Sequence, residues 1–231
     1  MESDLSGRRV AVLAADGVDE AELTGARQAL ASAGATVLVL APHDGEIQAM
    51  RGLERAERLT VDRAVSHAHG GEYDALVIPG GVAGVDALRL SRQAVQLVRE
   101  CMMADKPVAA AGHGPWLLIE ADAVRGRTLA SSASIRTDIR NAGGTWTDQP
   151  VQVDGALVTG RGGSDLPAWC AAIGQRLAGE MAAAAADERA DELVEQSFPA
   201  SDPPPGPVSI GTVHDATPRP RRGEEGGRAH P

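Results

Sequence analysis

A sharp turn with the sequence A-A-A-G-H-G-P, at positions 109–115, is the place where this chain could do chemistry. The apolar run Pro107–Ala111 leads into it, and an apolar helix is expected from Trp116 to Ala121. A strand-to-helix turn of this kind holds one side chain out of the sheet beside backbone amides, which suits a nucleophile. Its apex residue is Gly112, which has no side chain, so a covalent mechanism would need another group.

Serine and cysteine side chains elsewhere in the chain are the first alternatives for the nucleophile that Gly112 lacks. Ser131, Ser132 and Ser134 follow a later strand, but no histidine is evident to activate them, so surface or loop-capping serines are favoured. Cys101 and Cys170 fall within expected helices, where we interpret them as buried, reduced thiols.

Histidines offer two further alternatives. A glutamine-amidotransferase triad needs a histidine after the turn, but the later ones are His214 and His230 in the tail, so that class is excluded. His67, His69 and Glu72 could be imagined as a metal site, yet no further ligands stand at a suitable spacing. A solvated loop is favoured there, and we expect no metal or other cofactor.

Alternating strands and helices must position the turn. A strand at Arg9–Ala14, an amphipathic helix at Asp19–Ala33 and a strand at Thr36–Leu40 form a β-α-β unit, which implies parallel strands with a right-handed crossover. The later expected elements are a short strand pair near Ile47 and Leu59, a short helix after Asp62, strands at Ala75–Ile78, Val108–Ala111 and Thr128–Ser131, helices at Ser91–Ala104, Ile135–Ala142 and Leu166–Ala178, and a hairpin of Val151–Val153 with Ala156–Thr159.

This order predicts a doubly wound α/β sandwich in which the strand ends at Ala14, Ile78 and Ala111 converge on one edge, where such sheets bind ligands. The loop P-G-G-V-A-G at 79–84 reaches the same edge. It lacks the G-x-G-x-x-G spacing of a nucleotide site, so an oxyanion-type turn is favoured.

The composition limits the class of protein. With 231 residues, 2% aromatic, the chain is expected to bury one aliphatic core, as a parallel sheet under helices does. Its net charge is −10 and its only lysine is Lys106, which argues against binding to nucleic acid or to an anionic membrane. The N-terminus lacks the apolar core of a signal peptide and no run is long enough to span a membrane, so we expect a soluble, cytoplasmic protein.

Four segments are expected along the chain. Residues 1–7 form an N-terminal arm, 8–179 the folded domain, 180–196 an acidic and helical extension, and 197–231 a disordered tail rich in Pro, Gly and Arg. Phe198 lies beside prolines in this tail. It is either a short docking motif or a helix-end contact, and the second reading is favoured.

Several segments together resemble the DJ-1/PfpI superfamily, most closely the PfpI branch of intracellular proteases and general stress proteins. The resemblance runs in register from about Arg8 to Ala178. It is carried by D-G-V-D-E-A-E-L (16–23), Y-D-A-L-V-I-P-G-G-V-A (73–83), K-P-V-A-A-A-G-H-G-P-W-L-L-I-E-A (106–121), V-R-G-R-T-L (124–129) and I-R-T-D-I-R-N-A-G-G (135–144). It implies a flavodoxin-like three-layer sandwich with a mostly parallel central sheet, a homo-oligomer (dimer or hexamer), and peptidase, glyoxalase, deglycase or chaperone activity.

The resemblance also implies a site. In this family the apex is a cysteine beside a buried glutamate, which corresponds to Glu22, and it is followed by a histidine, which corresponds to His113. The amides of Gly81 and His113 would form the oxyanion hole, and an acid from a neighbouring subunit would correspond to Asp86. The cysteine itself is replaced by Gly112.

A second departure concerns the pocket wall. Where the branch has an aromatic residue between its serine and proline, this chain reads Ser131-Ser132-Ala133-Ser134. We therefore expect a smaller, more open wall in which Ser132 contacts a ligand.

Two hypotheses follow. The first, which is favoured, is a non-catalytic member of the family that binds a small polar or carbonyl ligand between Glu22, Gly81, Gly112 and His113, or acts as a protective stress-type protein. The second is an altered hydrolase or lyase in which Glu22 is a general base toward a small carbonyl compound, without a covalent step. A competing interpretation of Glu22 is an exposed acid in the first turn of a helix, where it favours the helix dipole.

Overall fold

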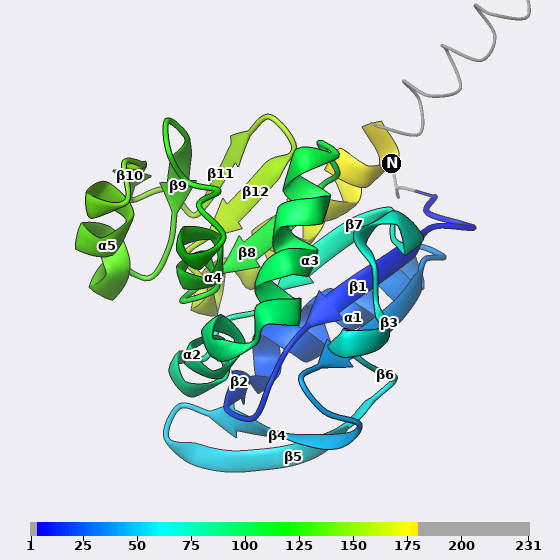
Figure 1. Ribbon diagram of the computed structural model, residues 1–231. Helices are drawn as coiled ribbons and strands as arrows, with labels where there is room; N and C mark the ends of the chain where they lie inside the picture. The colour runs from blue at the N-terminus through cyan, green and yellow to red at the C-terminus, as the bar shows by residue number, and fades with distance from the viewer. Residues whose placement is uncertain (1–3, 180–231) are drawn as a thin grey trace, which may run out of the picture. The chain divides into compact units, whose positions relative to one another are not determined.

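The structure is a computed structural model that describes residues 4–179 of the 231. Its centre is a seven-stranded sheet with the strand order β11-β12-β8-β7-β1-β3-β6 (Figure 1). Every neighbouring pair in it is parallel except β11 with β12. The strands are β1 (Arg9–Leu13), β3 (Thr36–Ala41), β6 (Arg63–Ala64), β7 (Ala75–Ile78), β8 (Val108–Ala111), β11 (Val151–Asp154) and β12 (Leu157–Gly160).

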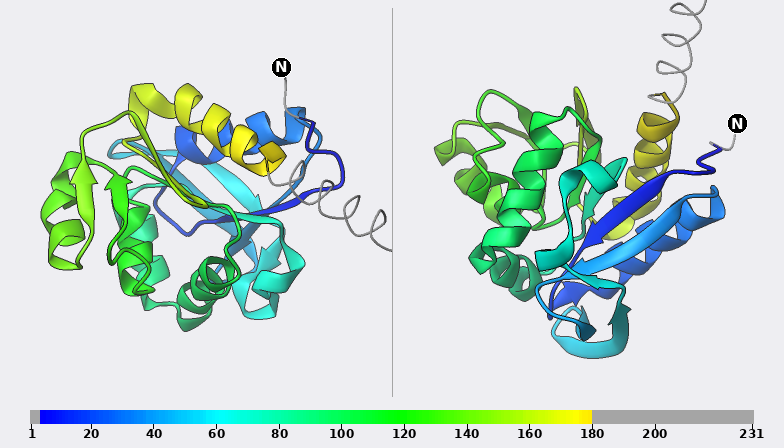
Figure 2. Two further views of the ribbon diagram at one scale, coloured as in Figure 1. Left: turned by 90° about the horizontal axis from the view of Figure 1, so that it is seen from above. Right: turned by 45° about the vertical axis from the view of Figure 1, so that its right-hand side comes forward.

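Helices cover both faces of this sheet, which makes the three-layer sandwich (Figure 2). One face carries α2 (Val82–Leu90), α3 (Arg92–Met103) and α4 (Pro115–Glu120). The other carries α1 (Glu20–Ser32) and a helix that begins at Leu166 and runs at least to residue 179. The flavodoxin-like, mostly parallel fold expected from the sequence is confirmed.

Strands of the central sheet such as β1 are apolar because helices cover both faces of the sheet. In β1, Ala11 and Leu13 belong to the core under α2, α3 and α4, whereas Val10 and Val12 belong to the core under α1. Successive side chains of a strand point to opposite faces, so a strand buried on both faces must be apolar throughout. All four of these side chains are fully buried.

Two smaller sheets and four short 3-10 turns complete the described part. One sheet joins β2 (Val18–Asp19), β4 (Gly45–Arg51) and β5 (Glu54–Val61), and the other joins β9 (Thr128–Ala130) to β10 (Thr145–Thr147), beside α5 (Arg136–Asn141). The turns are η1 (Val65–His67), η2 (Gly70–Glu72), η3 (Ala133–Ile135) and η4 (Gly163–Asp165).

Four elements differ from the sequence expectation. Helix α2 starts at Val82, inside the stretch 79–84 that was expected to be only a turn, and it is capped by Gly81 with no side-chain hydrogen bond. It buries only Gly84, Val85 and Leu88, so its sequence carries a weak helical pattern. Strand β10 was not expected, and the pair β4 and β5 is longer than predicted.

The carboxyl ends of β1, β7 and β8 meet at one edge, because these strands are neighbours in the sheet. The loops after them carry Glu22, the stretch 79–81 and Gly112, so the expected convergence of strand ends at Ala14, Ile78 and Ala111 is confirmed. No helix within residues 4–179 is long and apolar enough to cross a membrane. The extension 180–196 and the tail 197–231, with Phe198, His214 and His230, lie outside the described residues.

The described part of the N-terminal arm packs onto the domain. The side chain of Leu5 is fully buried in the core under α1, and its amide donates a hydrogen bond to the carbonyl of Ala33 at 2.7 Å. This segment therefore closes the end of α1.

We predict that Leu5→Ala lowers the free energy of unfolding by about 2–4 kcal/mol, because it removes a buried side chain and leaves a cavity. Leu53→Ala is the matched control: Leu53, at the tip of the β4–β5 hairpin, is 98% exposed, so its loss should change stability by less than about 0.5 kcal/mol. Urea unfolding of both variants measures the difference, and equal midpoints would contradict the packing of the arm.

Candidate functional site

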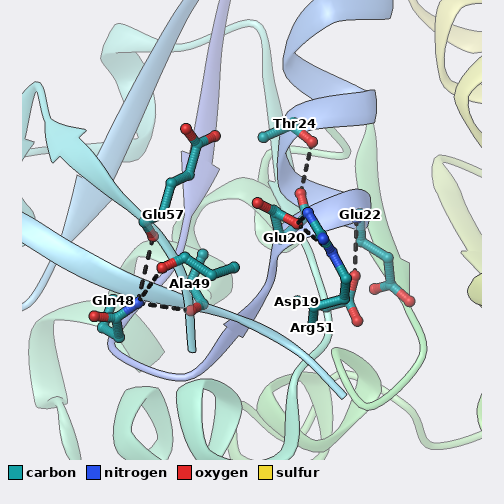
Figure 3. A network of polar contacts seen from close by, with 9 residues as sticks. Asp19, Glu20, Glu22, Thr24, Gln48, Ala49, Arg51 and Glu57 are labelled. Carbon is teal, nitrogen blue, oxygen red and sulfur yellow. Dashed lines mark hydrogen bonds and ion pairs between the residues drawn. The ribbon is translucent and has the colours of Figure 1, made fainter. Parts of the chain in front are cut away.

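Glu22 enters the site from the first turn of α1. Asp19 caps this helix, and its Oδ1 accepts a hydrogen bond from the amide of Glu22 at 3.0 Å (Figure 3). The two acids of the turn have different surroundings, since Glu20 pairs with Arg51 at 2.6 Å whereas the side chain of Glu22 points away from that pair. Glu22 is only 6% exposed, so the reading of it as an exposed first-turn acid is wrong.

Glycines surround the carboxyl group of Glu22. The amide of Gly80 donates to Oε2 at 2.6 Å, and the amide of Gly163 donates as well. A Cβ atom placed on Gly80 would lie 2.8 Å from Oε2, one on Gly112 would lie 3.0 Å from Oε1, and one on Gly162 would overlap Oε1. These glycines come from the loops after β7, β8 and β12, so the loops can close around the carboxyl group only without side chains.

Burial changes the protonation of this group. It raises the pKa of Glu22 from 4.5 to about 7, the amides of Gly80 and Gly163 lower it, and the charge of Asp19 raises it further. No positively charged side chain of the described residues contributes to this balance. At neutral pH the carboxyl group is therefore present in both its acidic and its basic form, as acid–base chemistry requires.

The apex lies directly beside Glu22. Gly112 has a φ of +55°, a conformation that costs other residues about 1–3 kcal/mol. Its amide donates to the carbonyl of Gly160 at 3.0 Å and its carbonyl accepts from the amide of Ser132 at 2.9 Å. The elbow is thus held on both sides, and it keeps the geometry of a nucleophile turn without a nucleophile.

The amides of Gly81 and His113 lie on adjoining loops of this edge. A Cβ atom placed on Gly80 would be 3.0 Å from the amide nitrogen of His113, which shows how closely the loops after β7 and β8 approach. Within residues 4–179 neither the amide of Gly81 nor that of His113 has a hydrogen-bond acceptor. Both amides are available to a ligand oxygen.

His113 and two serines form a chain of hydrogen bonds. Nε2 of His113 lies 3.0 Å from Oγ of Ser134, which lies 3.1 Å from Oγ of Ser132. The statement that no histidine serves these serines is therefore wrong, because the loop after β9 folds back over the elbow. Burial lowers the pKa of His113, which favours the neutral imidazole.

Trp116 forms the adjoining wall. Its ring lies 5.3 Å from that of His113 and under the guanidinium of Arg89 at 5.7 Å. Its Nε1 donates to Oδ2 of Asp138 at 2.7 Å. These contacts hold Trp116 against the imidazole of His113.

The structure separates other candidate residues from this cluster. Asp86 is exposed on α2, where it pairs with Arg89 at 3.6 Å. Ser131 is fully buried, where its hydroxyl accepts from Nε1 of Trp146, so it is not a surface serine. Glu72 pairs with Arg63, and within residues 4–179 no group of three or more His, Cys, Asp or Glu could hold a metal.

The two cysteines have unreactive thiols. Burial raises the pKa of Cys101 to about 11, and burial together with the charge of Glu22 raises that of Cys170 to about 11. Cys101 is buried as expected, whereas Cys170 is only partly buried. Both lie in helices, outside the elbow at Gly112.

Sequence reasoning missed the contact of Ser134 with His113 and the glycines around Glu22 other than Gly112. Gly80 and Gly162 follow strands of the central sheet, which is a usable signal for close approach. No sequence pattern indicates the contact of Ser134 with His113, because this contact depends on where β9 lies beside the main sheet.

Comparison with known proteins gives a family match and several relatives. The model of the DJ-1/PfpI family matches residues 8–176. Deglycase TK1284 of Thermococcus kodakarensis is 37% identical over 70% of this chain and 94% of its own length. Protein/nucleic acid deglycase 2 of Escherichia coli is 36% identical over 70% of this chain and 93% of its own, and General stress protein 18 of Bacillus subtilis is 35% identical over 71% and 94%.

Solved structures show the same fold. Drosophila melanogaster DJ-1beta superposes with a TM-score of 0.70 at 25% identity, over 76% of this chain and 92% of its own. A two-domain protein of Anabaena variabilis, with DJ-1/ThiJ/PfpI-like and ferritin-like domains, has a TM-score of 0.69 at 35% identity, over 74% of this chain and 48% of its own.

We predict that Gly162→Ala destabilises the fold by about 2–4 kcal/mol, because the new methyl group overlaps the carboxyl group of Glu22. Gly163→Ala is the control: its φ is also positive, at +58°, but nothing lies within 4 Å of the added carbon, so only about 1 kcal/mol of backbone strain is expected. In a Glu22→Ala background the cost of Gly162→Ala should fall, because only the backbone strain at its φ of +80° remains, whereas the cost of Gly163→Ala should stay the same by thermal unfolding. An unchanged cost of Gly162→Ala in that background would contradict the close approach.

We further predict that stability falls as the pH rises through 7. The pKa of Glu22 is higher in the folded state than in the unfolded chain, so its contribution is complete below pH 4.5 and is lost as the carboxyl group ionises. The shift corresponds to about 3 kcal/mol. Urea unfolding between pH 5 and 8.5 should show Glu22→Gln gaining stability relative to the unaltered protein; a constant difference would contradict the raised pKa.

Proposed function

The chain belongs to the DJ-1/PfpI family, and we propose that it binds a small polar carbonyl compound at the elbow without forming a covalent bond there. The oxygen of the compound would accept hydrogen bonds from the amides of Gly81 and His113. The carboxyl group of Glu22, protonated or ionised, would donate to or accept from a neighbouring hydroxyl group of the ligand. In this proposal the protein is a non-catalytic, protective member of a stress-related family.

One observation carries this proposal. The buried carboxyl group of Glu22 lies beside Gly112, which has no side chain to form a bond with a ligand, and the amides of Gly81 and His113 on the adjoining loops have no acceptor within residues 4–179. Buried polar groups normally have partners, so amides left open beside a buried acid favour a bound oxygen compound. The resemblance to the family places a cysteine at position 112, and covalent catalysis fails without such a group.

The names of the relatives support the ligand class. Several are called deglycases, a name that refers to sugar-derived adducts, and another is called a general stress protein. We infer a carbonyl compound for this chain because its amide donors and its acid are suited to a carbonyl oxygen with an adjacent hydroxyl group.

A second function is favoured by one specific observation, the pKa of about 7 at Glu22. A carboxyl group with this pKa can take a proton from the carbon next to a carbonyl group and return it to the neighbouring oxygen. The protein would then be an altered lyase or isomerase-type enzyme with Glu22 as general base and no covalent intermediate.

The proposal also covers the cellular location and the oligomeric state of the protein. We place the protein in the cytoplasm, in line with the free thiols of Cys101 and Cys170. We also propose a homo-oligomer, since α2 exposes Val82 and Leu90, at 53% and 85%, on the helix that carries Asp86. A second copy could bring its own Asp86 toward His113, and sedimentation equilibrium of the full chain tests the association.

We predict that hydroxyacetone raises the melting temperature of the protein, whereas 1,2-propanediol, which lacks the carbonyl group, does not. Glu22→Ala should abolish the shift because it removes the acid beside the carbonyl site, and Leu53→Ala should keep it. Differential scanning calorimetry measures the effect. Equal shifts with both compounds, or an unchanged shift in Glu22→Ala, would contradict the proposed ligand class.

A measurement of substrate turnover distinguishes binding alone from catalysis with Glu22 as general base. With methylglyoxal, the unaltered protein should consume no substrate if it only binds, and consumption that is lost in Glu22→Gln would instead establish the second function. Gly112→Cys serves as the control for an intact site: its thiol should be alkylated faster than Cys101 and Cys170, whose pKa values are about 11. A slow thiol at position 112 would mean that the elbow no longer resembles a nucleophile turn.

A further inference from the structure

The rim of the site carries a serine within hydrogen-bonding distance of a histidine. Ser134 is exposed in the turn η3, and its Oγ lies 3.0 Å from Nε2 of His113. The hydroxyl of Ser132 lies 3.1 Å from the same Oγ. If Ser132 donates to Ser134, the proton of Ser134 is directed at His113, which is the arrangement of an activated serine.

We propose that Ser134 and His113 form a serine–histidine dyad that accepts acyl groups from small esters. Oγ of Ser134 attacks the carbonyl carbon of the ester and its proton moves to Nε2 of His113. The bond from that carbon to the alkoxy oxygen then breaks, and the leaving alcohol takes the proton. Water hydrolyses the acyl-serine in the reverse sense, giving a carboxylic acid and free Ser134.

This inference goes beyond the proposed function. It uses neither Gly112 nor the carboxyl group of Glu22, and it moves the covalent step from the apex to the loop after β9. The backbone links the two places, because the amide of Ser132 donates to the carbonyl of Gly112 at 2.9 Å. The serine therefore stands beside the elbow and not on it.

The state of the histidine fits a general base. Burial lowers the pKa of His113, so the neutral imidazole needed to accept a proton prevails at neutral pH. The ring also packs against that of Trp116, at a centroid distance of 5.3 Å, and Trp116 is itself fixed by its hydrogen bond to Asp138 and by Arg89 above it. The position of the base thus depends on this packing as well as on its contact with Ser134.

The surroundings of Ser134 and His113 limit the size of the acyl group and the rate of its transfer. Residues 132–134 have small side chains and are partly or fully exposed, so the rim is open to a short acyl group. Within the described residues no carboxylate bonds to His113, and a dyad without this third group is slow; in a serine protease its loss costs about 10⁴ in rate. Trapping the serine is therefore a sharper measurement than turnover.

The first experiment treats the full-length protein with a fluorophosphonate probe and locates the adduct by peptide mass spectrometry. We expect one adduct, on Ser134, which forms as the probe loses fluoride and the serine proton passes to His113. Labelling should fall at least tenfold in Ser134→Ala and in His113→Gln. Ser32→Ala is the matched control, because Ser32 is an exposed serine at the end of α1 that should not affect labelling.

The outcomes decide the inference. No adduct, or an adduct on Ser132 that persists in Ser134→Ala, overturns the assignment of the nucleophile. Labelling that survives His113→Gln, in a variant with an unaltered circular dichroism spectrum, overturns the role of the histidine. The binding of hydroxyacetone is measured separately, so a failure of the dyad does not bear on the proposed function.

A second experiment replaces the serine by a residue that keeps a nucleophilic side chain. Ser134→Cys places a thiol beside His113, and its alkylation by iodoacetamide at pH 7 should be at least tenfold faster than that of Ser32→Cys. The background is low, because Cys101 and Cys170 have pKa values of about 11. Equal rates in the two variants would overturn the dyad even if each variant folds normally.

Discussion

The burial of the carboxyl group of Glu22 is the constraint on which this edge of the molecule depends. The group is almost fully covered, no positive charge of the described residues contributes to its pKa, and only backbone amides compensate for the loss of water. The loops can bring amides this close to the carboxyl group only where the residues packed against it carry no side chains, which explains the glycines Gly80, Gly112 and Gly162. Three loops of the central sheet are therefore shaped around one acid.

The buried carboxyl group of Glu22 lowers the stability of the fold. A buried acid with a pKa of about 7 is partly ionised at neutral pH, and its ionisation opposes folding. A chain under no functional constraint would gain stability from a neutral side chain at this position. Under the proposed function, this loss of stability at Glu22 accompanies the binding of a ligand.

Two kinds of chemistry meet at the same edge. The interior holds the acid and two open amides, which suit a carbonyl oxygen, whereas the rim holds a hydroxyl chain that ends on His113. His113 belongs to both, because its amide faces the elbow and its ring faces Ser134. Deglycases and a general stress protein are the named relatives in this family, and in this chain the elbow has a glycine, Gly112, at its apex.

The sequence by itself determined the central sheet and the place of the site. Strands buried on both faces must be apolar throughout, so β1, β7 and β8 stand out from their neighbours, and parallel strands bring their carboxyl ends to one edge. It did not determine α2, whose glycine-rich start hides its helical pattern, or the packing of Leu5.

Only the tertiary structure decided which groups touch. Burial of Glu22 depends on loops more than fifty residues away along the chain, and the contact of Ser134 with His113 depends on how the strand β9 lies beside the main sheet. Local patterns of residues report which face of an element is buried. They carry no information on the distance between two polar groups on separate loops, because that distance is set by the packing of the whole domain.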